Sequence, residues 1–193
     1  MRTLIVGLSA LLLAACTQAS NPADQADRSD TVAQIADPGA ENNCPATASG
    51  AWEGMQVEAS ASGADCATAH AVITIRHGAQ TLWTETYLAN QVMVFAGAES
   101  VEDMQRRLNE WVNPPGAARN STGDLPVWAP GATHPMSGEF PFYAEEGVDR
   151  AAYETLRGRD APMFCYIQGM ESEACLALEN GRLIKIGVQS FPG

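Results

Sequence analysis

Alternation of apolar and polar residues predicts β-strands over much of the chain. Residues 55–60 alternate Met, Val and Ala with Gln, Glu and Ser, and other segments are rich in β-branched and aromatic residues. The predicted strands are residues 55–60, 71–77, 81–88, 91–96, 162–168, 174–179 and 182–188. Asn180-Gly181 favours a tight hairpin, since a type I′ turn needs two positive φ angles. Residues 139–143 are a further candidate, a short edge strand in which Pro141 would be tolerated.

Two stretches have the period of a helix instead. Apolar residues recur at helical spacing between Ser100, a potential N-cap, and Asn113-Pro114-Pro115, which cannot continue a helix: Val101, Met104, Leu108 and Trp111. A second, shorter helix fits residues 148–158, with Asp149 as N-cap and Gly158 at its end. We therefore expect an α+β fold: one antiparallel sheet of six to seven strands with two helices.

The segment 114–147 breaks both periods and is the candidate binding loop. It combines many prolines and glycines with aromatic residues, and so long a loop in a compact domain is usually functional or disordered. The predicted surface consists of Trp128, His134, Phe140 and Tyr143. It would take a protein, peptide or glycan. The alternative is that these side chains fold back and cover one face of the sheet.

The first residues have the layout of an export signal. Arg2 precedes an apolar stretch that is too short to span a membrane and is followed by small residues. Leu13-Ala14-Ala15-Cys16 resembles the lipobox of bacterial lipoproteins. This resemblance implies cleavage before Cys16, acyl chains such as palmitate on that residue, and an anchor in the cell envelope. Thr17 then favours the outer membrane, facing the periplasm. An ordinary secretory signal with a chance cysteine is the alternative.

These features divide the chain into three parts. Residues 1–15 are the expected signal peptide, and residues 16–43 begin with the lipidated cysteine and continue as a polar, acidic tether. Having almost no large apolar side chains, the tether is predicted to be disordered and to span roughly 30 Å. Residues 44–193 are expected to form a single globular domain.

Charge narrows the range of partners. The formal net charge is −12, which argues against nucleic acid and against anionic membrane surfaces. A basic partner and simple solubility both fit. The expected partners are therefore the membrane, through the lipid anchor, and a protein, peptide or glycan of the envelope.

Four cysteines remain once Cys16 is lipidated. An even number in an oxidising compartment predicts two disulfides, and we favour the pairing between sequence neighbours among the three that are open: Cys44–Cys66 and Cys165–Cys175. Zinc is the rival hypothesis, but the chain has no C-x-x-C pair and no histidine at ligand spacing from a cysteine. We expect no metal and no cofactor.

No catalytic motif stands out. The sequence lacks a G-x-S-x-G elbow, an H-E-x-x-H motif and a phosphate-binding glycine loop. We expect a non-enzymatic interaction or structural role, and no residue is assigned to catalysis. The alternative is an envelope hydrolase acting on glycan or peptide, in which His134 and Glu139 are the best available pair.

A second resemblance concerns residues 60–64. Ser60-Ala61-Ser62-Gly63-Ala64 is similar to a serine–glycine stretch in envelope-anchored inhibitors of animal lysozymes. This resemblance implies that Ser62 would enter the lysozyme cleft. The chain departs from the family pattern at Asp65, where a basic residue would be expected nearby.

Overall fold

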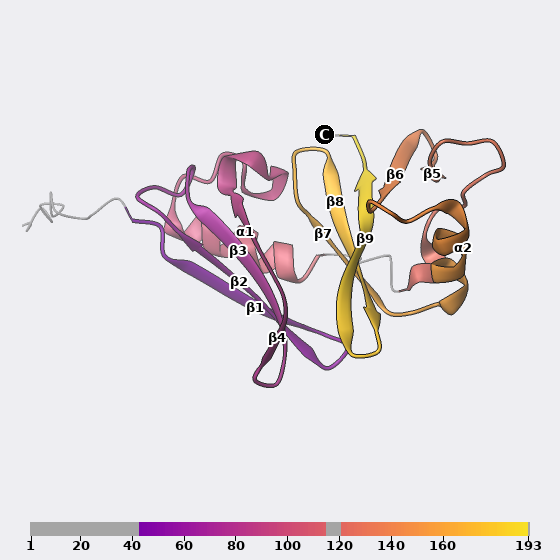
Figure 1. Cartoon of the computed structure of the whole chain (residues 1–193). Helices are drawn as coiled ribbons and strands as arrows, with labels where there is room; N and C mark the ends of the chain where they lie inside the picture. The colour runs from indigo at the N-terminus through magenta and orange to yellow at the C-terminus, as the bar shows by residue number, and fades with distance from the viewer. Residues whose placement is uncertain (1–42, 115–120, 193) are drawn as a thin grey trace, which may run out of the picture. The chain divides into compact units, whose positions relative to one another are not determined.

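Two antiparallel sheets, rather than the single sheet predicted, organise the folded part of the chain (Figure 1). The computed structural model describes residues 43–114 and 121–192. The predicted signal peptide, Cys16 and nearly all of the tether lie outside these residues. The α+β class and the two α-helices are confirmed, but the strands divide into a sheet of four and a sheet of five.

The first sheet is a meander in which each strand pairs with the next along the chain. Its order is β1-β2-β3-β4, and the strands are β1 (Ala46–Trp52), β2 (Met55–Ser62), β3 (His70–His77) and β4 (Gln80–Leu88). The predictions for β2, β3 and β4 are confirmed. β1 was not predicted, because its small residues ATASGAW carry little β-strand signal.

Alternation along these strands separates an apolar face from a polar one. On β2, Val57 and Ala59 are buried, and they are paired across the sheet with Ile75 and Ile73 of β3, which are fully buried. The residues between them point to the opposite face, where the side chains are mainly hydroxyl-bearing or charged. This polar face forms the site described below.

Helix α1 (Val101–Val112) packs against β1 and β2. Its N-cap is Ser100, as predicted: the Ser100 side chain accepts a hydrogen bond from the Asp103 N–H at 3.1 Å. The helix ends at Val112, directly before Asn113-Pro114. Met104, Leu108 and Trp111 are buried, which confirms the apolar stripe that the spacing predicts.

The second sheet has the order β5-β6-β9-β8-β7. Its strands are β5 (Met136–Ser137), β6 (Phe140–Ala144), β7 (Met163–Ile167), β8 (Ser172–Glu179) and β9 (Arg182–Ser190). Asn180 and Gly181 both have positive φ, 51° and 73°, which confirms the predicted tight turn between β8 and β9. β6 pairs with β5 on one side and β9 on the other, so it is not the edge strand that we expected.

Helix α2 (Arg150–Arg159) begins after Asp149, whose carboxylate accepts a hydrogen bond from the Ala152 N–H at 2.8 Å. The predicted N-cap is therefore confirmed. The helix runs one residue past Gly158, to Arg159, and its C-cap is Asp160, which adopts the left-handed conformation with φ of 53°. Tyr153 and Leu156 are its buried residues.

The predicted strand at residues 91–96 is wrong. Two 3₁₀ turns stand there, η1 (Ala89–Gln91) and η2 (Met93–Phe95). Val92, Phe95 and Ala98 are buried at a spacing of three, which suits 3₁₀ geometry rather than a strand. The short apolar run was ambiguous, because a buried turn and a buried strand have the same composition.

An aromatic cluster joins β4, α1 and β7. The Trp111 ring lies edge-on to Phe95, with centroids 4.8 Å apart, and its Nε1–H donates to the Ile167 carbonyl at 2.7 Å. Tyr166 accepts a hydrogen bond from Trp83 Nε1 at 3.2 Å, and its hydroxyl lies 3.0 Å from that of Tyr87. Side chains of both sheets therefore share this core. A separate cluster packs beneath α2 around Phe142 and Tyr153.

Both disulfides have the favoured pairing. Cys44–Cys66 closes a separation of 22 residues in the first sheet, and Cys165–Cys175 closes one of 10 between β7 and β8. Cys165 and Cys175 are direct partners in the antiparallel register. Each bridge therefore stabilises one of the two sheets.

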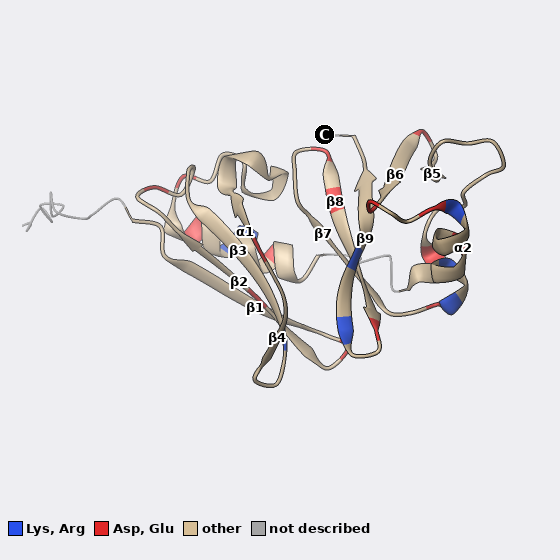
Figure 2. Ribbon diagram, viewed as in Figure 1, with Lys and Arg blue, Asp and Glu red and all other residues tan. Residues whose placement is uncertain are grey.

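In the described residues, no helix has the length and hydropathy needed to cross a membrane. Figure 2 shows the positions of acidic and basic residues along the ribbon, dispersed over both sheets and both helices.

Candidate functional site

The polar face of the first sheet contains a hollow of about 650 Å³, which we name the outer-face hollow. β1, β2 and β3 form its floor and two side chains of α1 its rim. Its polar lining consists of Thr47, Ser49, Glu58, Ser60, Thr74, Arg76, Gln105 and Asn109. Concave sites with a few converging polar groups are the usual form of ligand sites.

Strand register brings these side chains together. Ser49 is the partner of Glu58, and Glu58 is the partner of Thr74, so three neighbouring strands contribute one row of polar side chains. A second row joins Thr47, Ser60 and Val72. The rows face the same way because side chains two residues apart on a strand share a face.

Arg76 and Glu58 form an ion pair within this lining. Arg76 Nε lies 3.0 Å from Glu58 Oε2, and both side chains are 39% exposed. Such an exposed pair contributes little stability. The contact uses Nε alone, so in the described part of the chain neither terminal nitrogen of Arg76 has a protein partner. These two nitrogens can bind a carboxylate in the two-point geometry typical of arginine.

The remaining polar groups differ in how far they are already engaged. The Thr74 hydroxyl lies 3.2 Å from the Thr84 hydroxyl on β4. Gln105 accepts from the Thr47 N–H at 3.1 Å and donates to the Thr47 carbonyl, so its amide is committed to β1. Ser49 and Ser60 have no hydrogen bond from their hydroxyls within the described residues, which leaves them available to a ligand.

The predicted binding loop is only partly assembled as a surface. Trp128 turns inward: its ring packs edge-on to Tyr153 at 5.5 Å, and its Nε1–H donates to the Ala132 carbonyl at 2.9 Å. His134 and Tyr143 remain exposed and lie ring to ring at 4.9 Å. Phe140 is half-buried in β6. Among these four described side chains, the ring contact between His134 and Tyr143 is the one aromatic contact.

The suggested acid–base pair is not brought together. His134 contacts the ring of Tyr143, and no contact with Glu139 is present although both residues are described. Glu139 lies in the turn between β5 and β6 and is exposed. Proton transfer through a direct hydrogen bond would require the two side chains to approach one another.

Ser62, the residue in the lysozyme-inhibitor resemblance, is exposed at the end of β2. The neighbouring Asp65 is bound by Thr68, whose hydroxyl donates at 2.7 Å and whose N–H donates at 2.8 Å. These hydrogen bonds lower the pKa of Asp65, so a negative charge lies close to Ser62 in the chain. The departure from the family pattern is thus a stable carboxylate.

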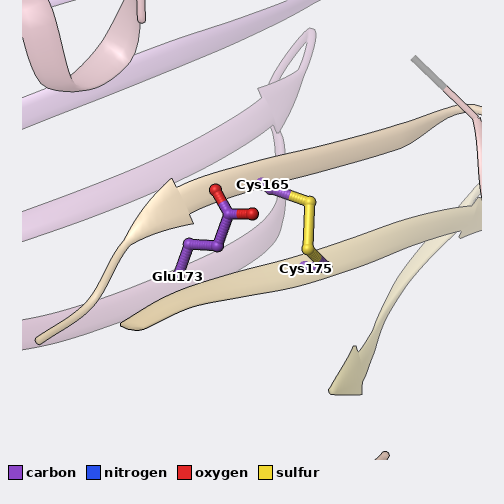
Figure 3. A group of neighbouring side chains, drawn as sticks. All are labelled: Cys165, Glu173 and Cys175. Carbon is purple, nitrogen blue, oxygen red and sulfur yellow. A yellow bond between two sulfur atoms is a disulfide. The ribbon is translucent and has the colours of Figure 1, made fainter. Parts of the chain in front are cut away.

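One group of possible metal ligands occurs in the described residues: Cys165, Glu173 and Cys175, whose ligand atoms lie within 4.8 Å of one another (Figure 3). The two sulfurs are bonded to each other, so neither is the thiolate that a metal requires. Glu173 alone offers too few ligand atoms for a metal centre. The group is best described as a disulfide with a carboxylate beside it.

Sequence reasoning did not single out Glu58, Arg76 or the hydroxyl residues of the hollow. Their signal was present in the alternation of β2 and β3, where most outward positions are polar, but a solvent-facing sheet has the same pattern. The hollow differs from a plain solvent-facing sheet because side chains of α1 form one of its walls, and the position of α1 is not visible in the strand pattern. Comparison with other proteins adds no further assignment: no family model, no curated protein and no solved structure matches the chain.

Proposed function

We propose that the chain is a lipid-anchored protein of the bacterial cell envelope that binds a polar envelope fragment without transforming it. Cys16 would carry the anchor, residues 17–43 would act as the tether, and the outer-face hollow would hold the ligand. The outer membrane, with the domain facing the periplasm, is the proposed location. The lipobox resemblance supports the anchor, and the chemistry of the hollow supports the binding role.

The observation that carries the binding role is the unpaired end of Arg76. An arginine that lines a hollow and uses only its Nε in an ion pair can hold a carboxylate with its terminal nitrogens. Nearby serine hydroxyls and the Glu58 carboxylate can bind hydroxyl or ammonium groups. Fragments of the cell wall combine sugar hydroxyls with the carboxylates of short peptides. They are therefore the ligand class that this lining fits.

Binding is tested with the full chain in detergent and purified soluble peptidoglycan fragments, titrated by calorimetry. We expect Arg76→Gln to weaken binding by about tenfold, because charge-assisted hydrogen bonds contribute roughly 1.5–3 kcal/mol each. Arg182→Gln is the matched control, since Arg182 is an exposed strand arginine outside the hollow. Equal affinity of wild type and Arg76→Gln would refute the proposed site.

The anchor is tested separately. Mass spectrometry of the protein from its native host should find acyl chains on Cys16, and Cys16→Ser should release the domain from the membrane fraction. An unmodified Cys16 in the mature protein would refute the anchor while leaving the hollow untouched. The two parts of the proposal can thus fail independently.

A further inference from the structure

The two sheets have four edge strands, which differ in how far their outward backbone groups are already hydrogen-bonded. β1 and β4 are the edges of the first sheet, and β5 and β7 those of the second. An open edge exposes backbone N–H and carbonyl groups that can pair with another chain, so natural proteins usually block it. β5 is only two residues long, and at β7 the Ile167 carbonyl accepts a hydrogen bond from Trp111.

The β1 edge is blocked by side chains of α1 and the residue after it. Cys44 N–H bonds to the Gly63 carbonyl, so by the alternation of an antiparallel ladder Thr47 and Ser49 point their backbone groups away from β2. Gln105 bonds both backbone groups of Thr47, and Asn113 Nδ2 donates to the Ser49 carbonyl at 3.3 Å. Three outward groups of β1 are thereby satisfied: the N–H and carbonyl of Thr47 and the carbonyl of Ser49.

On β4, the strand register shows which backbone N–H and carbonyl groups are not bonded to β3. Ala89 N–H bonds to the Ala69 carbonyl at 2.9 Å, and the register of β3 with β4 then makes Trp83, Glu85 and Tyr87 the residues bonded to β3. The close approach of the Thr74 and Thr84 hydroxyls agrees, because they lie in a non-hydrogen-bonded pair. Thr84 and Thr86 therefore direct their backbone groups outward. Both are exposed, and no backbone partner for them exists within the described residues.

We infer that the β4 edge is a docking site for an extended basic peptide of a partner protein, which would add a strand beside Thr84 and Thr86. The negative charge at this edge and on the whole chain favours a basic peptide as the occupant. Glu85 lies between the two open residues, is exposed and forms no ion pair in the described part of the chain. The net charge of −12 attracts a basic segment and repels a second copy of the chain.

The register specifies the peptide. Its residue opposite Glu85 would share that side chain's face and should be Lys or Arg, because opposite charges across a strand pair attract. The two peptide residues that flank this Lys or Arg would lie on the same polar face as Thr84 and Thr86, so threonine is suitable at both positions. The next residues would lie beside the apolar Trp83 and Tyr87. Acetyl-Val-Thr-Lys-Thr-Val-amide meets these requirements.

This inference is tested by titrating the fluorescently labelled peptide with the full chain in detergent. Thr86→Pro removes the outward N–H and should still fold, since proline is tolerated on an edge strand with its nitrogen facing solvent. We expect it to weaken binding about fivefold, the effect of one lost backbone hydrogen bond. Thr86→Val keeps the N–H and should bind as wild type does.

A second experiment reverses the charge of Glu85. Glu85→Lys should bind the lysine peptide about fivefold more weakly and prefer the peptide with glutamate at its centre. Equal binding by wild type and Thr86→Pro would overturn the inference, as would an unchanged preference in Glu85→Lys. Concentration-dependent dimers that Thr86→Pro abolishes would show a second copy as the occupant, and would also overturn it. Loss of peptide binding leaves the hollow's ligand unaffected, so the two proposals are distinguishable.

Discussion

The hydroxyls of Tyr87 and Tyr166 meet in the aromatic cluster that joins the sheets, 3.0 Å apart. Burial raises the pKa of Tyr87 above its usual value, and the nearby Tyr166 raises it further. Burial also raises the pKa of Tyr166, although the hydrogen bond with Tyr87 works in the opposite direction. Neither phenol is expected to ionise while the fold is intact.

This arrangement predicts alkaline instability. Below the ordinary tyrosine pKa of about 10, both residues are neutral in the folded and unfolded chains, so their contribution to stability is constant. Above it, the unfolded chain releases protons that the folded chain retains, and the free energy of unfolding falls as pH rises. Urea unfolding at pH 8 and at higher pH should show this loss, and Tyr87→Phe should reduce it.

The exposed Tyr143 provides the control. Tyr143→Phe should leave the pH dependence of unfolding unchanged. Absorbance near 295 nm gives an independent measure, because Tyr87 and Tyr166 should titrate only when the protein unfolds. Ionisation of Tyr87 and Tyr166 in the folded protein would contradict the prediction.

Single residues also set the limit of what the sequence could predict. The sequence predicts the caps and the tight turn, because these depend on local hydrogen bonds or φ angles. The residues concerned are Ser100, Asp149 and Asn180-Gly181. Gly187 was not recognised. Its φ is 155°, and a Cβ atom there would lie 2.4 Å from the Tyr143 carbonyl oxygen, a contact with a strand remote in sequence.

At the level of elements, α1 protects the edge of β1 through one glutamine. Gln105→Ala would remove two hydrogen bonds to the Thr47 backbone, and we expect a loss of about 1 kcal/mol in the free energy of unfolding. Hydrogen exchange should locate the effect. The Thr47 amide should exchange faster in the variant, while the Ala48 amide, which faces β2, should stay protected.

Equal exchange at Thr47 in the two proteins would show that Gln105 does not close this edge. The comparison extends to β4 in the wild-type chain: Thr84 and Thr86 should exchange faster than Trp83, Glu85 and Tyr87. Such alternation along one strand follows from the register and cannot be produced by general mobility.

The elements that were predicted correctly have a complete local signal. α1 combines a cap, an apolar stripe and a terminating proline, and β3 with β4 form a hairpin of strongly β-prone residues. Strand partnership across long separations carries no such signal. The single predicted sheet was wrong for that reason: α1 covers the β1 edge, and the later strands assemble around β9 instead.

For the whole molecule, the two disulfides test whether the sheets unfold together. Replacing either pair with alanine should cost about 3 kcal/mol, since the loops of 22 and 10 residues give similar closure entropies. Because Trp111 and Tyr166 connect the sheets, each double variant should still unfold in one transition, at lower urea. The measurement is urea unfolding followed by tryptophan fluorescence and circular dichroism.

Two separate transitions in either variant would show that the shared core does not couple the sheets. The outer-face hollow depends on this same long-range order, which explains why the sequence alone did not predict it. The aromatic residues of the proline-rich loop predict a binding surface, because binding surfaces are rich in aromatic residues. Trp128 is half-buried and packs against the cluster beneath α2, whereas the outer-face hollow is built mainly from serines, threonines and one ion pair.

The place of β9 has a consequence for biogenesis. It is the last strand along the chain, yet it occupies the middle of its sheet, between β6 and β8. As the chain emerges in order from the exporting machinery, the β1–β4 meander can form early, whereas β6 stays unpaired on that side until residues 182–190 of β9 have followed. Premature termination before Arg182 would therefore yield a product with two exposed hydrogen-bonding flanks, a natural substrate for chaperones and quality-control proteases.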